Sequence, residues 1–577
     1  MNKTAPYLML LLSISTAASC LTAARVLGQT APVNPTQQQI QPPLPIVPPL
    51  PPQPTEPLVT PPAPSPPPAL PSQPQIPVAK INVVGSTIFG PAQFDPITAP
   101  LLNRTVSLQE LQGAADAITQ LYLDGGYLTS RAVLGEQTIA GGVVTIRVIE
   151  GRLEEISVTG NEGLLKTYIT SRIQLGAGVP LNGNALEEQL RLLKVDPLFK
   201  NVSASLQPGT TEGASILAVR VDQARRPNGL LGMDTNTPPA IAPERGFLNF
   251  SYQNLSGVGD TIYGSYAVGV NLGEFDWGAS NTYEFGYSIP VNALNGTFSI
   301  RTVQGDSRIT QAVGQDLGIR STSNVYQINF RQPIIRSIRQ ELALSVGFTQ
   351  QSGQTFLFNN TPFPFGIGPD ANGYSRTSVV DFSQDYVHRD NSGAWVLRSQ
   401  LNFGLPIFDA TDNPGAIPSG QFFSWLAQGQ RVQQLWDDNF VILRSSLQLS
   451  PNNLLAFNQF VIGGETSVRG YATNARSGDN GFQFSTEGRF PIIRNADNAP
   501  MLQLVPLLDF GIVWNNPSNP NGPVANNVLL GSGLGLIYQP TPAVDIKFGY
   551  AVPVFNVPGQ GSSLQSDGFY FSIVGRP

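Results

Sequence analysis

The sequence predicts two small α+β domains followed by an antiparallel transmembrane β-barrel of about 16 strands. Three observations support this fold class: only 12% of the 577 residues are charged, residues 78–223 contain an internal repeat, and apolar and polar residues alternate from Gly229 onward. Soluble globular domains contain about 25% charged residues. Because no run of about 20 apolar residues follows the first 30 residues, we expect no membrane-spanning helix in the rest of the chain.

The residue composition argues against several classes of function. The sequence has one cysteine, Cys20, and one histidine, His388. These two residues cannot form a disulfide, a cysteine-based zinc site or a Cys/His catalytic pair within one chain. The net charge of −6 gives no reason to expect a nucleic acid partner. These counts argue against a metalloenzyme and against thiol chemistry, and His388 has no nucleophile elbow nearby, which argues against a hydrolase. We therefore predict no enzyme activity, no metal and no cofactor.

Residues 1–28 are predicted to be a secretory signal peptide. Lys3 supplies the positive charge, Tyr7–Ile14 supplies the apolar core, and small residues place the cleavage site before Gln29. A retained membrane anchor is the alternative, because the stretch after Lys3 carries no charge. The Ala-Ala-Ser sequence before Cys20 is a poor context for lipid attachment.

Residues 29–77 are predicted to be a disordered, proline-rich linker. Twenty of the 51 prolines lie between residues 31 and 77. Proline fixes φ and lacks the backbone donor, so neither a helix nor a central strand is expected. The segment should therefore be a semi-extended spacer.

Residues 78–151 and 152–225 are predicted to be two copies of one small two-layer domain. Each copy reads strand, helix, helix, strand, strand. Apolar residues between Leu108 and Leu123 recur at helical spacing along one face, and Gly125-Gly126 ends that helix. The other predicted elements are Val78–Gly85, Ala92–Leu102, Ser130–Gln137 and Val143–Glu150 in the first copy, and Glu155–Gly160, Leu165–Ile173, Asn184–Leu193, Val202–Leu206 and Ile216–Val221 in the second.

Residues 226–577 are predicted to form the barrel. Leu248, Phe250 and Tyr252 alternate with polar residues, and this period of two recurs along the region. A soluble β-sandwich also alternates, but its outer face is charged, whereas Lys547 is the only lysine after residue 227. A polar face rich in Gln, Asn, Ser and Gly fits an aqueous lumen, with lipid around the apolar face. Glycine- and proline-rich stretches predict surface loops at Gln351–Ser375, Asp409–Ser419 and Asn515–Asn527.

The repeat resembles the POTRA domain. The resemblance lies in Val83–Ser86, Asp124–Tyr127, Val148–Gly151 and Val158–Asn161. Two tandem copies before a barrel resemble two-partner secretion transporters, the hemolysin activation/secretion protein family of the Omp85 superfamily. This resemblance implies that the repeats bind extended, unfolded substrate, in part by adding a foreign strand to the exposed edge of their second strand. The basic candidates for contact with this cargo are Arg172, Arg191, Lys194 and Lys200.

One loop, Ile462–Tyr471, resembles the Val-Arg-Gly-Tyr/Phe signature of the POTRA-containing transporters. The resemblance implies that the loop folds back into the lumen and that Arg469 meets an acidic residue on the inner wall. The matching wall residue is Asp509. The alternation of apolar and polar residues along its strand independently places Asp509 on the polar face, together with Gly511. Glu487 also falls on a polar face and is a competing partner; the alternative is that the glycines only mark a turn. The predicted loop residues are Gly463, Gly464, Val468, Arg469, Gly470 and Tyr471.

The predicted function is that of an outer-membrane transporter, with its POTRA domains in the periplasm, which recognises an unfolded secreted partner protein and translocates it through the lumen. The alternative is a barrel-assembly factor of the same superfamily, while the repeat argues against a passive porin. The expected partners are the secreted cargo, outer-membrane lipid and, during biogenesis, the barrel-assembly machinery. Two features depart from the family. Its members often have a short N-terminal helix that plugs the pore, but here only Pro35–Gln41 could form one, because residues 29–77 are rich in proline. The chain also ends in Gly575–Pro577, without the terminal aromatic residue that is common in barrel proteins.

Overall fold

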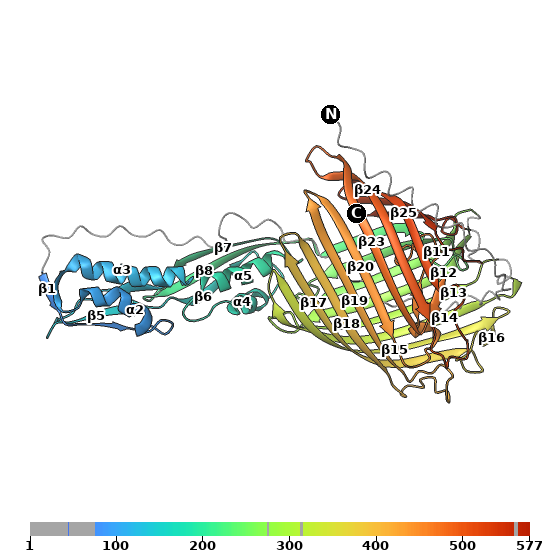
Figure 1. Ribbon diagram of the computed structural model, residues 1–577, viewed down its shortest axis with the longest axis horizontal. Helices are drawn as coiled ribbons and strands as arrows, with labels where there is room; N and C mark the ends of the chain where they lie inside the picture. Colours follow the sequence, from blue (N-terminus) through green and yellow to red (C-terminus); the bar gives the residue numbers. More distant parts are fainter. Residues whose placement is uncertain (1–43, 45–74, 274–275, 312–315, 559–562, 577) are drawn as a thin grey trace, which may run out of the picture. The chain divides into compact units, whose positions relative to one another are not determined.

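The computed structural model describes residues 44, 75–273, 276–311, 316–558 and 563–576 (Figure 1). The predicted signal peptide, the predicted plug segment and nearly all of the predicted linker lie outside these residues. In the described part of the chain, no helix combines the length and the apolarity needed to cross a bilayer.

The first repeat folds as a small sheet covered by helices. Its helix α3 begins with a capping box, in which Ser107 and Glu110 exchange hydrogen bonds between their side chains and backbone amides. Ile118 and Tyr122 of α3 are fully buried against the sheet, which has the order β2-β5-β4. The elements are β1 (Gln75–Val78), β2 (Lys80–Val84), α2 (Pro91–Thr98), η1 (Ala99–Leu101), β3 (Arg104–Ser107), α3 (Leu108–Asp124), β4 (Arg131–Val133) and β5 (Val143–Ile149).

Strand β1 was not predicted. It pairs antiparallel with β3 in a separate two-stranded sheet and begins at Gln75, three residues inside the range predicted as linker. Pro77 is compatible with this position because proline is tolerated in edge strands. Strand β4 is shorter than the predicted segment Ser130–Gln137, since it ends at Val133.

The second repeat has the predicted order of strand, helix, helix, strand and strand, without counterparts of β1 and β3. Asn182 caps α5 by accepting hydrogen bonds from the amides of Asn184 and Ala185. Ile169 and Leu190 are buried in its core, and the sheet order is β6-β8-β7, so β7 is an edge strand as β4 is in the first repeat. The elements are β6 (Arg152–Thr159), α4 (Lys166–Gln174), α5 (Gly183–Lys194), β7 (Phe199–Pro208) and β8 (Ala214–Gln223).

The rest of the described chain forms a closed antiparallel barrel of sixteen strands, drawn from green to red in Figure 1, with a short strand β16 added beside β15. The predicted fold class is therefore confirmed. The strands are β9 (Pro227–Asp234), β10 (Glu244–Gln253), β11 (Thr261–Asn271), β12 (Asp276–Pro290), β13 (Thr297–Arg308), β14 (Arg320–Arg336), β15 (Gln340–Leu357), β16 (Thr361–Pro362), β17 (Tyr374–Asp390), β18 (Gly393–Gly404), β19 (Phe423–Trp436), β20 (Asn439–Leu449), β23 (Asn480–Arg494), β24 (Pro500–Trp514), β25 (Val528–Thr541), β26 (Val544–Pro553) and β27 (Phe569–Gly575).

The connections of the barrel differ between its two ends. The second repeat runs directly into β9, and every connection at that end is short. The longer connections lie at the opposite end and span residues 235–243, 309–319, 358–373, 405–422, 450–479, 515–527 and 554–568. This asymmetry is typical of outer-membrane barrels, whose long loops face outward from the cell.

The loop predicted over Gln351–Ser375 is too long by several residues, because β15 continues to Leu357. Gln351 and Thr355 are buried in the wall of the barrel, where both pair with β14 and Gln351 also pairs with β17. Polar composition misled the prediction here, since the face of a barrel strand that points into the lumen can be as polar as a loop.

Candidate functional site

The connection between β20 and β23, residues 450–479, folds back inside the barrel. It contains a short hairpin of β21 (Phe460–Ile462) and β22 (Arg476–Gly478). Phe460 and Ile462 are fully buried, and Val513 of β24 packs with them on the face opposite the outward-facing Leu508, which is 49% exposed. The apolar cluster that holds the connection against the inner wall consists of Leu426, Phe460, Ile462, Val468, Tyr471, Val513, Leu529 and Val557.

The turn from Gly463 to Gly470 depends on left-handed backbone. Gly463 has φ +111°, and a side chain there would begin 2.5 Å from the carbonyl oxygen of Ala472. Gly470 has φ +95° and lies against the backbone of β26. Only glycine adopts such angles without strain in so little space, so these glycines are required by the path of the loop and not merely by a surface turn.

Arg469 contacts both acidic residues that the sequence proposed for it. Its Nε lies 2.7 Å from Oδ2 of Asp509, its Nη2 lies 2.8 Å from Oδ1 of Asp509, and its Nη1 lies 3.1 Å from Oε2 of Glu487. Asp509 has no exposed side-chain surface and the side chain of Arg469 is 11% exposed. The packed loop covers this pair and separates it from the water of the lumen.

Asp509 and Glu487 differ in what else they bind. Asp509 also accepts a hydrogen bond from the hydroxyl of Ser485 at 2.6 Å. Glu487 is shared, because Arg489 lies at 2.9 Å and Arg444 at 3.5 Å from its oxygens. Ser485, Arg489 and Arg444 were not predicted. The period of two could have found the first two, since Ser485 and Arg489 share the face of β23 that carries Glu487.

The rest of the loop motif is held by the last three strands. The buried hydroxyl of Tyr471 lies 3.1 Å from the carbonyl oxygen of Leu530 and 3.0 Å from that of Phe555. The hydroxyl of Tyr570 on β27 accepts a hydrogen bond from the amide of Gly470 and donates to the carbonyl of Tyr471. At Gly511, a side chain would begin 2.8 Å from Val468, so this glycine makes room for the loop.

The outer part of the connection is fixed by Asp479, which has no exposed surface. Its Oδ1 accepts from the amide of Leu454 at 2.9 Å, and its Oδ2 accepts from the amide of Asn516 at 3.0 Å and from Nδ2 of Asn519 at 2.8 Å. One carboxylate therefore joins the start of this connection to the loop between β24 and β25.

The four basic candidates of the second repeat have different surroundings. Arg172 is buried over the ring of Tyr168, 3.5 Å from its centre, and donates to the Tyr168 carbonyl at 2.9 Å. Burial lowers the pKa of Arg172. Arg191 pairs with Glu187 at 2.6 Å, whereas Lys194 and Lys200 are exposed. The structure thus removes Arg172 from the accessible surface, because α4 turns it inward.

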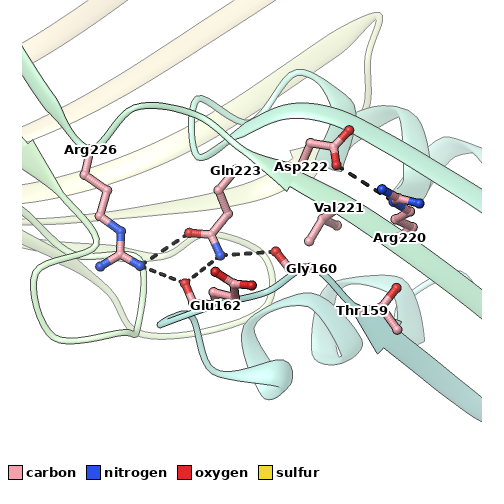
Figure 2. A pocket seen from close by; sticks show the side chains of 8 residues that line it. All are labelled: Thr159, Gly160, Glu162, Arg220, Val221, Asp222, Gln223 and Arg226. Carbon is pink, nitrogen blue, oxygen red and sulfur yellow. Dashed lines mark hydrogen bonds and ion pairs between the residues drawn. The ribbon is translucent and has the colours of Figure 1, made fainter.

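A polar pocket of about 660 Å³ opens at the end of the second repeat (Figure 2). Nε2 of Gln223 donates to the carbonyl oxygens of Gly160 and Glu162 at 3.3 and 2.7 Å, and Nη2 of Arg226 donates to that of Glu162 at 2.7 Å. These bonds tie the turn after β6 to the residues that lead into β9. The polar groups of the pocket thereby serve the connection between the repeat and the barrel wall.

A closed sixteen-stranded barrel with an inner loop anchored by an arginine, preceded by two α+β repeats, defines a transport protein of the outer-membrane type. The chain belongs to the haemolysin secretion/activation protein family ShlB/FhaC/HecB, which residues 213–538 match, and residues 76–151 match the POTRA domain of ShlB type. It is therefore a two-partner secretion transporter of the outer membrane that works with a secreted cargo protein, as the sequence predicted.

Individual relatives agree with this family. The outer membrane transporter CdiB of Escherichia coli is 26% identical over 480 residues, which cover 80% of this chain and 76% of the relative. The heme/hemopexin transporter protein HuxB of Haemophilus influenzae is 21% identical over 471 residues, with 79% of each chain covered. These similarities favour secretion over the barrel-assembly alternative.

Solved structures share the fold. CdiB from Escherichia coli superimposes with a TM-score of 0.67 at 22% identity, covering 87% of this chain and 91% of that one. BamA from Haemophilus ducreyi, lacking POTRA domains 1–3, gives a TM-score of 0.52 at 14% identity, covering 87% of this chain and all of that one. At these identities the comparison supports the architecture alone.

Proposed function

We propose that the chain recognises its unfolded partner protein in the periplasm with the second repeat and passes it through the barrel lumen without catalysis. The observation that carries the recognition step is strand β7. In the described part of the chain, this ten-residue strand pairs on one side only, with β8. An edge strand presents unpaired backbone donors and acceptors, to which an extended polypeptide can add as a further strand.

Charge near β7 supports this assignment. Lys200 lies within the strand and Lys194 in the last turn of α5, and both are exposed. Arg191 is partly engaged by Glu187, and Arg172 is buried, so we retain Lys194 and Lys200 as the cargo contacts. Each exposed lysine contributes little binding free energy by itself, because solvent and salt screen surface charges.

The lumen loop is proposed to control passage. Its apolar cluster and its covered ion pair fix it to the wall formed by β23 to β27, and it occupies space that a translocating chain would need. Elsewhere on the inner wall, three arginines are paired with carboxylates, which reduces their attraction for a moving polypeptide. These pairs are Arg301–Glu284 at 2.7 Å, Arg331–Glu341 at 2.6 Å and Arg398–Asp385 at 2.7 Å.

The outer face of the barrel is proposed to contact outer-membrane lipid directly. Phe250, Phe285 and Tyr326 are 50–62% exposed on this face, as expected for side chains that lipid covers. Insertion by the barrel-assembly machinery remains a prediction. The signal peptide over residues 1–28 and the start of the linker at residue 29 also remain predictions.

The test is site-specific photo-crosslinking. A photoreactive residue at Ser205, exposed on β7, should crosslink to the secreted partner during export. The matched control is Glu155, exposed on β6, the opposite edge of the same sheet. Crosslinking from Glu155 but not from Ser205 would move recognition away from β7.

A deletion distinguishes secretion from barrel assembly. Removing residues 154–223 should abolish export of the partner while other outer-membrane barrels keep their normal levels and the truncated barrel still inserts. A general loss of outer-membrane barrels would instead favour the assembly function.

A further inference from the structure

We propose that Gln565 is a positioning residue that couples the lumen loop to the closure of the barrel between its first and last strands, β9 and β27. Gln565 lies outside the Val-Arg-Gly-Tyr motif, in the connection between β26 and β27, and has no exposed surface. Its amide links three segments that are far apart in the sequence.

The junction that Gln565 closes is short. Strands β27 and β9 pair through four residue pairs, from Ser572↔Asp234 to Gly575↔Leu231. Their neighbours pair over longer stretches, since β9 and β10 share eight residue pairs. Beyond the four pairs, the backbone amide and the hydroxyl of Thr235 continue the contact, with Phe571, at 3.2 and 3.3 Å.

The Gln565 side chain extends this junction at the end of the barrel that carries the long loops. Its Nε2 donates to the carbonyl oxygen of Thr237 at 2.7 Å and lies 3.5 Å from that of Pro243, both in the connection after β9. Its Oε1 accepts from the amide of Thr473 at 3.0 Å and from the Thr473 hydroxyl at 2.8 Å. Thr473 follows the Val-Arg-Gly-Tyr motif by two residues.

Coupling follows from the geometry of one planar amide. The oxygen and nitrogen of Gln565 are fixed relative to each other, so the side chain cannot turn to a new partner on one side without losing the bond on the other. Because the amide is fully buried, loss of Thr473 would leave the side-chain oxygen of Gln565 as an unpaired acceptor, which is unfavourable. When the loop leaves this position, the hydrogen bond from Gln565 to the connection after β9 therefore weakens.

A second contact places β27 at the centre of this linkage. The hydroxyl of Tyr570 binds Gly470 and Tyr471 of the loop motif, as described above. Tyr570 of β27 and Gln565 of the connection before it thus both contact the loop, and of these two residues Gln565 also bonds to the connection after β9. This distinguishes Gln565 from a residue that merely supports the loop.

The test measures the junction and the loop separately, in a parent with Cys20→Ser. Disulfide formation in Met233→Cys/Ile573→Cys, a facing pair of β9 and β27, reports closure of the junction. Labelling of Ala472→Cys by a membrane-impermeant maleimide reports the loop, because Ala472 is 5% exposed. Neither readout requires cargo, so the test is independent of the secretion function.

Thr473→Val is the decisive variant. In the hydrogen bonds described above, Thr473 bonds to Gln565 and not to β9 or β27. It should raise labelling of Ala472→Cys and also lower junction crosslinking, each by about threefold to tenfold, the size expected for one lost hydrogen bond. Gln565→Leu should change both readouts at least as much. Gln421→Leu is the matched control, since Gln421 lies in another long loop, is exposed and bonds to Asp412.

Unchanged crosslinking in Thr473→Val would overturn the coupling, even with faster labelling. So would equal effects of Gln421→Leu and Gln565→Leu. If Gln565→Leu does not fold, the Thr473→Val result decides alone, because it leaves Gln565 and the closing strands intact.

Discussion

Arg469 donates two parallel hydrogen bonds to Asp509, from Nε to Oδ2 at 2.7 Å and from Nη2 to Oδ1 at 2.8 Å. The backbone amide of Arg469 donates to the same Oδ2 at 3.0 Å. One strand residue therefore fixes both the side chain and the main chain of one loop residue. Such a fork fits a guanidinium and cannot be reproduced by an ammonium group, which makes the contact specific for arginine.

Arg469→Ala is expected to abolish most secretion while the barrel still folds. It leaves the buried carboxylate of Asp509 with Ser485 and without a counter-charge, and breaking a buried pair costs about 3–5 kcal/mol. The loop would detach from β24, whereas the barrel strands keep their own hydrogen bonds. Secreted partner in the medium and the heat-dependent shift of the folded barrel on gels measure the two effects.

Asp509→Ala should resemble Arg469→Ala but be milder, because Arg469 keeps Glu487 at 3.1 Å. The double variant should be no worse than Arg469→Ala. The control is Arg308→Ala, whose pair with Asp276 is more exposed and therefore contributes about 0–1 kcal/mol. Strictly additive secretion defects would contradict the pairing.

Tyr471→Phe is expected to weaken the loop without removing its apolar packing. The hydroxyl lies among the backbone groups of Leu530 and Phe555, whose amides are each 3.2 Å away. Burying these groups without a partner costs about 1–3 kcal/mol. The temperature at which the barrel loses its folded gel mobility should fall. Tyr326→Phe, on the outer surface of the barrel, should leave this temperature unchanged. An equal fall in both variants would assign the effect to tyrosine content rather than to the loop.

The strands could be predicted because their apolar and polar residues alternate with a period of two. This period also assigns Asp509 to the inner face, whereas its contact with Arg469 was implied by the resemblance of the loop to the Val-Arg-Gly-Tyr/Phe signature. The alternation of residues along a strand could not choose between Asp509 and Glu487 as the partner of Arg469. It predicts the face on which a side chain lies, but not which residue of the loop the side chain contacts. The structure shows that no choice was needed, because a guanidinium has enough donors for both.

Other features depended on packing that the sequence does not encode locally. The burial of Arg172 results from the stacking of its side chain on Tyr168, and a charged residue on a short helix gives no sign of this. Gln565 and Asp479 lie in polar loop sequences, where buried and exposed residues look alike. Their importance appears only when the loops that they join are seen side by side.

The first repeat is expected to lose stability in acid through Glu150. Burial alone would raise the pKa of Glu150, but hydrogen bonds from the hydroxyl and amide of Thr87 and from Tyr122 hold it below its usual value. A lowered folded-state pKa means that the carboxylate stabilises the fold above its unfolded pKa of about 4.3, and that this contribution is lost as the pH falls through the folded-state pKa.

Glu150→Gln should therefore reduce the stability of the first repeat at pH 7 and have less effect at pH 3. Urea midpoints measured by pulse proteolysis of the full chain, with cleavage followed within residues 91–149, test this. Glu136→Gln, at an exposed position, is the control. An equal effect of Glu150→Gln at both pH values would contradict the role of the carboxylate.

Asp479→Ala is expected to open the outer mouth of the barrel. Asp479 is fully buried and accepts three hydrogen bonds from Leu454, Asn516 and Asn519, so its removal leaves these donors unpaired and separates two long loops. The barrel should still fold, because the strands do not depend on this carboxylate. Ion conductance in planar bilayers and sensitivity of cells to a large antibiotic should both rise.

Asp479→Asn should have an intermediate effect, because one oxygen remains to accept from Leu454 while the amide nitrogen faces the two donors from the loop after β24. Asp497→Ala is the control: Asp497 is exposed in the short connection between β23 and β24, at the opposite end of the barrel. If Asp479→Ala conducts no more than Asp497→Ala, the loops that it joins do not close the mouth. The lumen would then be blocked at the depth of Arg469, and Arg469→Ala alone should raise the conductance.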